Sequence, residues 1–221
     1  MNLFALISLT VSILCALLAI FTFLQAKSQI HRIWGIFNSN VAFWSFGLYL
    51  VGMAQSPSQA LFYWKFTFVF NTFISVFLYH VVHSFCQLQG KRFLIFAYLQ
   101  GVFFVFVVLF YRSFLREPQL IFDTIYYVKA SPLFSLWLLI FSFITGFAFY
   151  KIWQFIKISH GNKKIETLYL FWSMLVGFAG GYNIAFPLYN IIIYPVWHFS
   201  ICVYTAIFTF AVLRHNFLDI R

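Results

Sequence analysis

Seven runs of apolar residues, each long enough to cross a bilayer, occupy most of this chain of 221 residues. A helix needs about 20 apolar residues to span the hydrocarbon core of a membrane. Measured against that length, the predicted spans are residues 3–25, 33–53, 60–88, 93–111, 133–156, 165–186 and 195–212. We therefore expect an all-α integral membrane protein that folds as a seven-transmembrane helix bundle.

The composition indicates that lipid is the main solvent of this chain. Hydrophobic residues make up 63% of it, charged residues only 8%, and 34 residues are phenylalanine. A water-soluble domain of this length could not bury so much apolar surface in one core. A net charge of +10 would favour nucleic-acid binding in a soluble protein, but here the basic residues lie mostly between apolar runs. Membrane lipid is thus an expected partner, and nucleic acid is not.

Lysine and arginine are divided unequally between the two sets of span ends, and this division predicts the orientation. An odd number of spans places the termini on opposite sides, and basic loops favour the cytoplasm. Four basic residues belong to the side of the N-terminus: Lys65, Arg112, Arg116 and Lys129. Ten belong to the other side: Lys27, Arg32, Lys91, Arg92, Lys151, Lys157, Lys163, Lys164, Arg214 and Arg221. The N-terminus is therefore predicted outside and the C-terminus in the cytoplasm, with residues 213–221 as a cytoplasmic junction.

The longest predicted connection, residues 112–132 on the outer side, mixes charged with apolar residues. Long connections in compact bundles are often functional. Two interpretations remain open at this point. The segment is either a lid over the outer mouth of the bundle or a solvated connector with a few residues in the headgroups.

Three stretches combine aromatic, basic and small residues in specific patterns. Residues 40–49 read Asn-Val-Ala-Phe-Trp-Ser-Phe-Gly-Leu-Tyr, residues 61–65 read Leu-Phe-Tyr-Trp-Lys, and residues 211–220 read Ala-Val-Leu-Arg-His-Asn-Phe-Leu-Asp-Ile. These patterns resemble the seven-helix N-terminal region of bacterial histidine kinases and diguanylate cyclases, and the third is the most specific. The resemblance runs over essentially the whole chain. It implies a sensor in the bacterial inner (plasma) membrane that controls a cytoplasmic kinase or cyclase output domain as a homodimer.

The chain is not expected to be an enzyme or to hold a cofactor. None of its six histidines precedes the acidic residue that usually follows a kinase phosphoacceptor, and Gly180-Gly181 lies in an apolar run rather than in a nucleotide-binding loop. His80, His83 and Cys86 are spaced three residues apart, a set that could bind a transition metal. Ordinary packing at the membrane interface is the favoured interpretation of these three residues, and no metal site is predicted.

Polar side chains inside membrane spans are costly, so they indicate either function or hydrogen bonds between helices. The candidate ligand-binding residues are Trp64, Lys65, Asn71, Asn183 and His198, all in the outer half of the predicted bundle. We expect the last three to line an outward-facing cavity between the third, sixth and seventh spans, suited to a small apolar or amphiphilic ligand. Two alternatives stay open: hydrogen bonds that only fix packing, and a Lys65 side chain that reaches into the headgroups.

The sixth and seventh spans contain the residues expected to relay a signal. Gly180 and Gly181 allow a close helix approach or a bend, and Arg214 and Asp219 belong to the cytoplasmic junction. The predicted function is a sensory input module that binds an extracellular or membrane-dissolved ligand and signals through the seventh helix. The alternative is a small seven-helix transporter, although an odd helix count and sparse polar residues argue against one.

Overall fold

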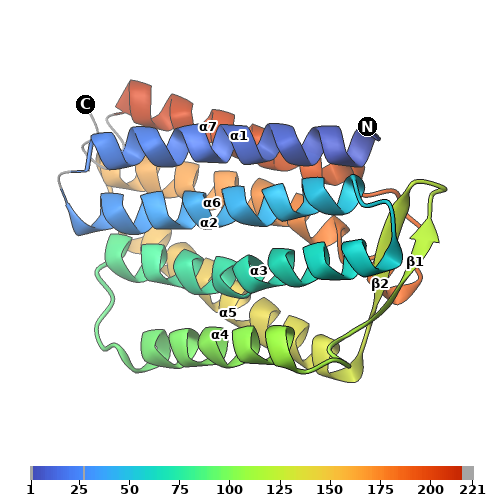
Figure 1. Ribbon diagram of the computed structural model, residues 1–221. Coiled ribbons are helices and arrows are strands. Elements are labelled where there is room, and N and C mark those ends of the chain that lie inside the picture. The colour runs from blue at the N-terminus through green and yellow to red at the C-terminus, as the bar shows by residue number, and fades with distance from the viewer. Residues whose placement is uncertain (1, 27, 216–221) are drawn as a thin grey trace.

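The computed structural model describes residues 2–26 and 28–215, and within them the chain forms seven long helices. They are α1 (Leu3–Leu24), α2 (Gln29–Gly52), α3 (Pro57–Phe85), α4 (Arg92–Phe110), α5 (Pro132–Ile158), α6 (Gly161–Asn183) and α7 (Ser200–His215). The helices run alternately in opposite directions, so the two ends of the chain lie at opposite ends of the bundle (Figure 1). The predicted helical bundle is thus confirmed, while its membrane orientation stays a prediction.

Several helices begin at residues whose side chains accept a hydrogen bond from a backbone N–H of the first turn. Asn2, Ser56 and Ser131 each accept a hydrogen bond from the backbone N–H three residues ahead, at 2.8, 3.3 and 3.0 Å. A proline follows each of these serines at the first helical position, where its fixed φ suits the helix and its missing N–H costs nothing. These caps fix where α1, α3 and α5 start.

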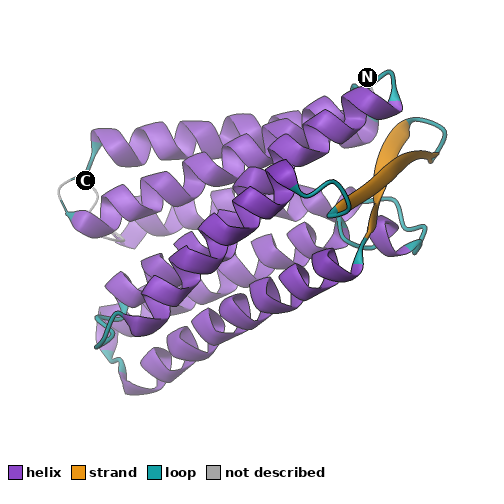
Figure 2. Ribbon diagram, turned by 60° about the horizontal axis from the view of Figure 1, so that its bottom comes forward, coloured by secondary structure: helices purple, strands orange, loops and turns teal. Residues whose placement is uncertain are grey.

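Six of the helices enclose a central space. Neighbours around this ring are α1, α2, α3, α5, α6 and α7, and α7 closes the ring on α1. The fourth helix, α4, packs on the outer side of α3 (Figures 1 and 2). Close approach within the first half of the ring depends on two glycines, because a Cβ at Gly47 would overlap Thr67 and one at Gly52 would lie 2.8 Å from the Cβ of Ala5.

A β-hairpin covers one end of the bundle, and the sequence did not predict it. Its antiparallel strands are β1 (Leu115–Ile121) and β2 (Ile125–Ala130). The purely all-α expectation is therefore wrong for this segment. The interpretation of residues 112–132 as a solvated connector is also wrong, because Leu115, Ile125, Tyr127 and Val128 are buried. The hairpin packs against α3 and the turn after α6 (Figure 2).

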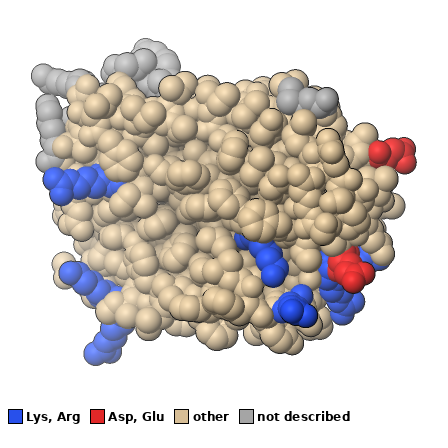
Figure 3. Space-filling model, in the orientation of Figure 1, with Lys and Arg blue, Asp and Glu red and all other residues tan. Residues whose placement is uncertain are grey.

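Among the described residues, five helical segments are long and apolar enough to cross a membrane: Leu3–Leu24, Pro57–Phe85, Arg92–Phe110, Pro132–Ile158 and Gly161–Tyr189. The second helix misses this standard because of polar residues such as Asn38, Asn40 and Ser45, and Val196–Ile207 is a further apolar stretch. In Figure 3 much of the visible face is uncharged; basic side chains lie toward both ends, and the acidic ones lie at the right of the view. These features support a multi-pass membrane protein.

The polar residues of α2 are used inside the protein. Asn38 accepts a hydrogen bond from the Tyr204 hydroxyl (2.8 Å), and Asn40 donates one to the Phe70 carbonyl (2.8 Å). Because α2 lies between α1 and α3, such groups meet neighbouring helices instead of lipid. Hydropathy alone therefore underestimates how well this helix suits a bilayer.

Candidate ligand-binding cavity

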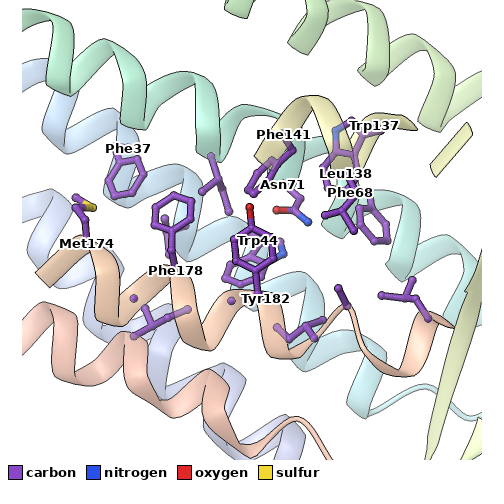
Figure 4. Close-up of a pocket in the computed structure, with 18 of the residues that line it drawn as sticks. Phe37, Trp44, Phe68, Asn71, Trp137, Leu138, Phe141, Met174, Phe178 and Tyr182 are labelled. Atoms are coloured by element: carbon purple, nitrogen blue, oxygen red, sulfur yellow. The ribbon is translucent and has the colours of Figure 1, made fainter. Parts of the chain in front are cut away.

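An apolar cavity lies inside the ring of helices. Side chains of α2, α3, α5, α6 and α7 form its walls. Figure 4 shows them spread from Phe37 and Met174 at one end to Phe68 and Trp137 at the other, with Asn71 between them. The third, sixth and seventh helices all line the cavity as expected, and α2 and α5 contribute as well. Its opening to the outside stays a prediction.

The cavity is long and narrow. Its lining follows α6 from Met174 to Tyr182, a rise of about 12 Å along a helix. Its volume is about 80 Å³, and nearly all of the side chains that line it are apolar or aromatic. The lining therefore suits a linear apolar chain better than a sugar or a hydrated ion.

Asn71 is the only amide or charged residue among the described residues that line the cavity. Its side chain is half-buried and makes no hydrogen bond to the part of the chain that the structure describes. The amide therefore keeps one acceptor and two donor hydrogens for an occupant. A polar group on an otherwise apolar ligand would find its partner here.

Trp64 also lines the cavity, but its polar atom is already used. The indole Nε1–H donates to the Tyr126 carbonyl in the hairpin at 2.9 Å, and the ring packs on Tyr127 with centroids 4.8 Å apart. Burial, with a smaller contribution from Tyr194, raises the pKa of the Tyr127 phenol well above its usual range. The Tyr127 hydroxyl thus stays protonated and donates to the Ile184 carbonyl at 3.3 Å. Trp64 fastens the hairpin and offers a ligand its ring face.

Asn183 and His198 are buried away from the cavity, so the prediction that they line it is wrong. His198 lies within 3.1 Å of Ser45 Oγ, which itself donates to the Ser8 carbonyl at 2.8 Å. Since the serine hydrogen points to Ser8, the imidazole Nε2 must carry the hydrogen that reaches Ser45. His198 therefore links the helical turn before α7 to α2 and α1. Its ring meets Trp44, a cavity residue, edge-on at 5.1 Å.

The buried Oδ1 atom of Asn183 has no hydrogen-bond partner in the described part of the chain. Lys65 does not line the cavity but lies in a separate groove, where its Nζ donates to the Leu109 carbonyl at 3.4 Å. The five candidate residues are thus divided between the cavity (Trp64, Asn71), the packed interior (Asn183, His198) and this groove (Lys65).

The two adjacent glycines of α6 face different surroundings. A Cβ at Gly180 would overlap the Trp197 carbonyl oxygen and Ser200 Oγ, so here α6 approaches the 3-10 turn η2 (Val196–Phe199) and α7 very closely. Gly181 lines the cavity, and a Cβ there would lie 3.7 Å from the Trp44 ring. The expected close approach is confirmed for Gly180. The relay role of both glycines stays a prediction.

The other relay candidates lie at the end of the chain. Arg214 is described only through the helical backbone of α7, and Asp219 lies outside the described residues. The proposed junction to an output domain therefore stays a prediction.

The three metal candidates at the far end of α3 have other surroundings. His80 Nδ1 lies 2.7 Å from the Tyr98 hydroxyl, His83 Nε2 lies 3.0 Å from the Gly90 carbonyl, and Cys86 is buried. Among the described residues, no three metal-binding side chains converge. The two imidazoles serve instead to hold α3 to α4 and to the turn between them.

Sequence reasoning missed the contribution of α5 to the cavity. Phe134, Trp137 and Phe141 form one wall, yet no pattern distinguishes them among 34 phenylalanines and seven tryptophans. Only the spacing of three and four residues, which places them on one helical face, could have indicated that they act together.

The chain matches no protein-family model, no curated protein and no solved structure. What indicates its function is therefore the geometry of the cavity and of the helices around it.

Proposed function

We propose that the protein is a membrane sensory input module whose cavity binds a small apolar or amphiphilic ligand with a linear chain. The observation that carries this proposal is the composition of the wall: Met174 and Phe178 of α6 and Ile201 and Tyr204 of α7 all line the same narrow space. An occupant would contact both helices that lead to the C-terminal end. Its binding would change their position relative to α2 and α3.

The output belongs to the same proposal. Because the last residues resemble the exit of histidine kinase and diguanylate cyclase sensor regions, the proposed receiver is a kinase or cyclase domain in the cytoplasm of a bacterium, reached through α7. The protein itself would perform no chemistry and would act as a homodimer. The alternative, a transporter, would need polar groups along a path through both leaflets, and among the described lining residues Asn71 is the only amide or charged one.

Ligand binding is tested by filling the cavity at Gly181. Purified protein in lipid nanodiscs would be irradiated with a photoreactive palmitate analogue, and the labelled peptides mapped by mass spectrometry. We expect labels on the cavity-facing parts of α3, α5 and α6. Gly181→Leu should weaken this labelling about fivefold or more, since overpacking a filled site costs at least about 1 kcal/mol.

Gly146→Leu is the matched control, because a Cβ at Gly146 meets no atom within 4 Å. It should label as the wild type does. Equal labelling of the Gly181→Leu variant, or labels confined to the outer surface of α4, would contradict ligand binding in the cavity.

The relay is tested separately with a histidine kinase joined after Arg221. Each inserted residue rotates a continuing helix by about 100°. One inserted residue at the junction should disturb kinase control by the photoreactive palmitate, whereas seven inserted residues should largely restore it. Identical behaviour of the two insertions would rule out a continuous helical linkage.

A further inference from the structure

A second hollow, separate from the cavity, opens on the surface at the hairpin end of the bundle. It lies between α3, the end of α4, the start of β1 and the start of α5, and its volume is about 800 Å³. Three basic side chains line it, Lys65, Arg112 and Arg116, together with the single acidic residue Glu117. We call it the basic groove. Figure 3 shows blue side chains gathered beside a red one near this end of the molecule.

The positive charge of the basic groove exceeds the negative charge beside it, because Glu117 is the one carboxylate among the residues that line it against three cations. In the described part of the chain the only ion pair joins Lys163 and Glu166, at the other end of the bundle. The guanidinium groups of Arg112 and Arg116 make no hydrogen bond or ion pair to any residue the structure describes. Lys65 reaches only a backbone carbonyl, at 3.4 Å.

Strand pairing adds a fourth cation next to the groove. In the hairpin Arg116 lies directly opposite Lys129. Like charges at such paired positions repel each other and destabilise a sheet. An anion beside Arg116 would remove this penalty. The basic groove and the neighbouring strand β2 thus carry the four basic residues that the sequence places on the side of the N-terminus, three in the groove and Lys129 beside it.

The surroundings of the basic groove indicate what kind of anion it meets. Lys65 lies eight residues into α3, about 12 Å from its start, at the level where α4 ends. Large apolar side chains lie exposed on the two helices below: Phe106 (59%) and Phe110 (74%) on α4, and Leu139 (67%) on α5. A cationic hollow above an exposed apolar surface matches an amphiphile with an anionic head and acyl chains.

We propose that the basic groove binds the phosphate of an anionic phospholipid headgroup, with Arg112 and Arg116 donating to its oxygens and Lys65 adding charge. The planar arginine fork suits phosphate oxygens, and such charge-assisted hydrogen bonds are the strong ones. This site goes beyond the proposed sensor function and does not depend on it. It also explains why basic residues occur at an end where the positive-inside rule would disfavour them.

The test measures lipid retention by native mass spectrometry of the full chain, released from detergent with phosphatidylglycerol or with phosphatidylcholine. We expect the wild type to retain phosphatidylglycerol in preference to phosphatidylcholine. The double variant Arg112→Gln/Arg116→Gln should bind phosphatidylglycerol about tenfold or more weakly, because it loses several charge-assisted hydrogen bonds. The variant Arg112→Lys/Arg116→Lys keeps the charge without the fork and should fall between the two.

The control is Lys91→Gln/Lys164→Gln, which removes two exposed lysines at the opposite end of the bundle and should bind as the wild type does. Binding of glycerol 3-phosphate distinguishes a site for a whole lipid from a site for any soluble phosphate. Equal binding of this soluble ester in place of the lipid would overturn the lipid assignment. Unchanged phosphatidylglycerol binding by the arginine-to-glutamine variant, or equal retention of phosphatidylcholine, would overturn the site. Labelling of the cavity by the photoreactive palmitate should be the same in all these variants, so the two proposals fail independently.

Discussion

Gly180 offers the sharpest test of how α6 and α7 are joined. A methyl group at this position would overlap both Ser200 Oγ and the carbonyl oxygen of Trp197. Ser200 could rotate, but it would then give up the hydrogen bond that it donates to the Val176 carbonyl at 2.7 Å. Trp197 contributes a backbone atom, which cannot move unless the whole turn η2 moves. Gly180→Ala should therefore separate α6 from α7.

The expected change in the free energy of unfolding combines two costs and one gain. Overpacking costs about 1–3 kcal/mol, and a lost hydrogen bond costs about 1 kcal/mol. Alanine regains up to about 1 kcal/mol through its better helix propensity. The free energy of unfolding of Gly180→Ala should thus fall by about 1–3 kcal/mol. For a chain of this length, the melting temperature changes by about 2–4 °C per kcal/mol.

Thermal unfolding in a mild detergent, followed by circular dichroism, measures this loss. Two alanine substitutions serve as controls. Gly146→Ala meets no atom within 4 Å, and Gly181→Ala meets the Trp44 ring only at an ordinary contact distance of 3.7 Å. Both should melt at or above the wild-type temperature. A Gly180→Ala variant that melts together with Gly146→Ala would refute the close packing of α6 on α7.

Three further predictions concern the hairpin, the buried histidine and the orientation. Trp64→Phe should speed amide hydrogen exchange in the hairpin by the equivalent of about 0.5–1.5 kcal/mol, because the hydrogen bond from the indole to the Tyr126 carbonyl is lost. The control Trp137→Phe should leave that exchange unchanged, because the Trp137 Nε1 has no hydrogen-bond partner in the described chain. His198→Leu should lower the free energy of unfolding by about 1–3 kcal/mol through the loss of its link to Ser45 and leave palmitate labelling of the cavity intact. Asn71→Leu should instead weaken palmitate labelling and leave the free energy of unfolding unchanged. A loss of labelling in His198→Leu without loss of stability would restore the ligand-contact interpretation. Reporters inserted between Asp123 and Thr124 and fused after Arg221 should report opposite sides of the membrane, and the same side for both would contradict the orientation.

The helices could be predicted from the sequence because one property, the length of an apolar run, determines them. The hairpin could not, since its buried strand Ile125–Ala130 is short and sits in a chain where almost every segment is apolar. Its turn also gives only a weak sequence signal. Phe122 and Asp123 both have positive φ values, 52° and 56°. Aspartate tolerates this conformation, but glycine or asparagine would be typical in place of the phenylalanine.

The candidate site was predictable only in part, for a geometric reason. Helical spacing places Asn71 on the same face of α3 as Trp64 and Phe68, and all three line the cavity. Spacing does not determine how a helix is rotated against its neighbours. His198 lies in a 3-10 turn with about 3.0 residues per turn. Spacing that assumes a continuous α-helix through His198 and α7 therefore predicts the wrong direction for its side chain. It meets α2 instead.

The packing of the ring gives the proposed relay a physical basis. The helices α1, α2 and α3 approach closely at Gly47 and Gly52, and α6 approaches α7 closely at Gly180. The cavity lies between these two groups of helices, and among the described residues no glycine brings α2 equally close to α6. In the proposed relay, an occupant that presses on α6 would displace α7 with it, because α6 at Gly180 directly meets Ser200 and the Trp197 carbonyl oxygen. Sliding of one packed group of helices past another is a shear motion, and such a motion can carry the effect of ligand binding to a distant helix end.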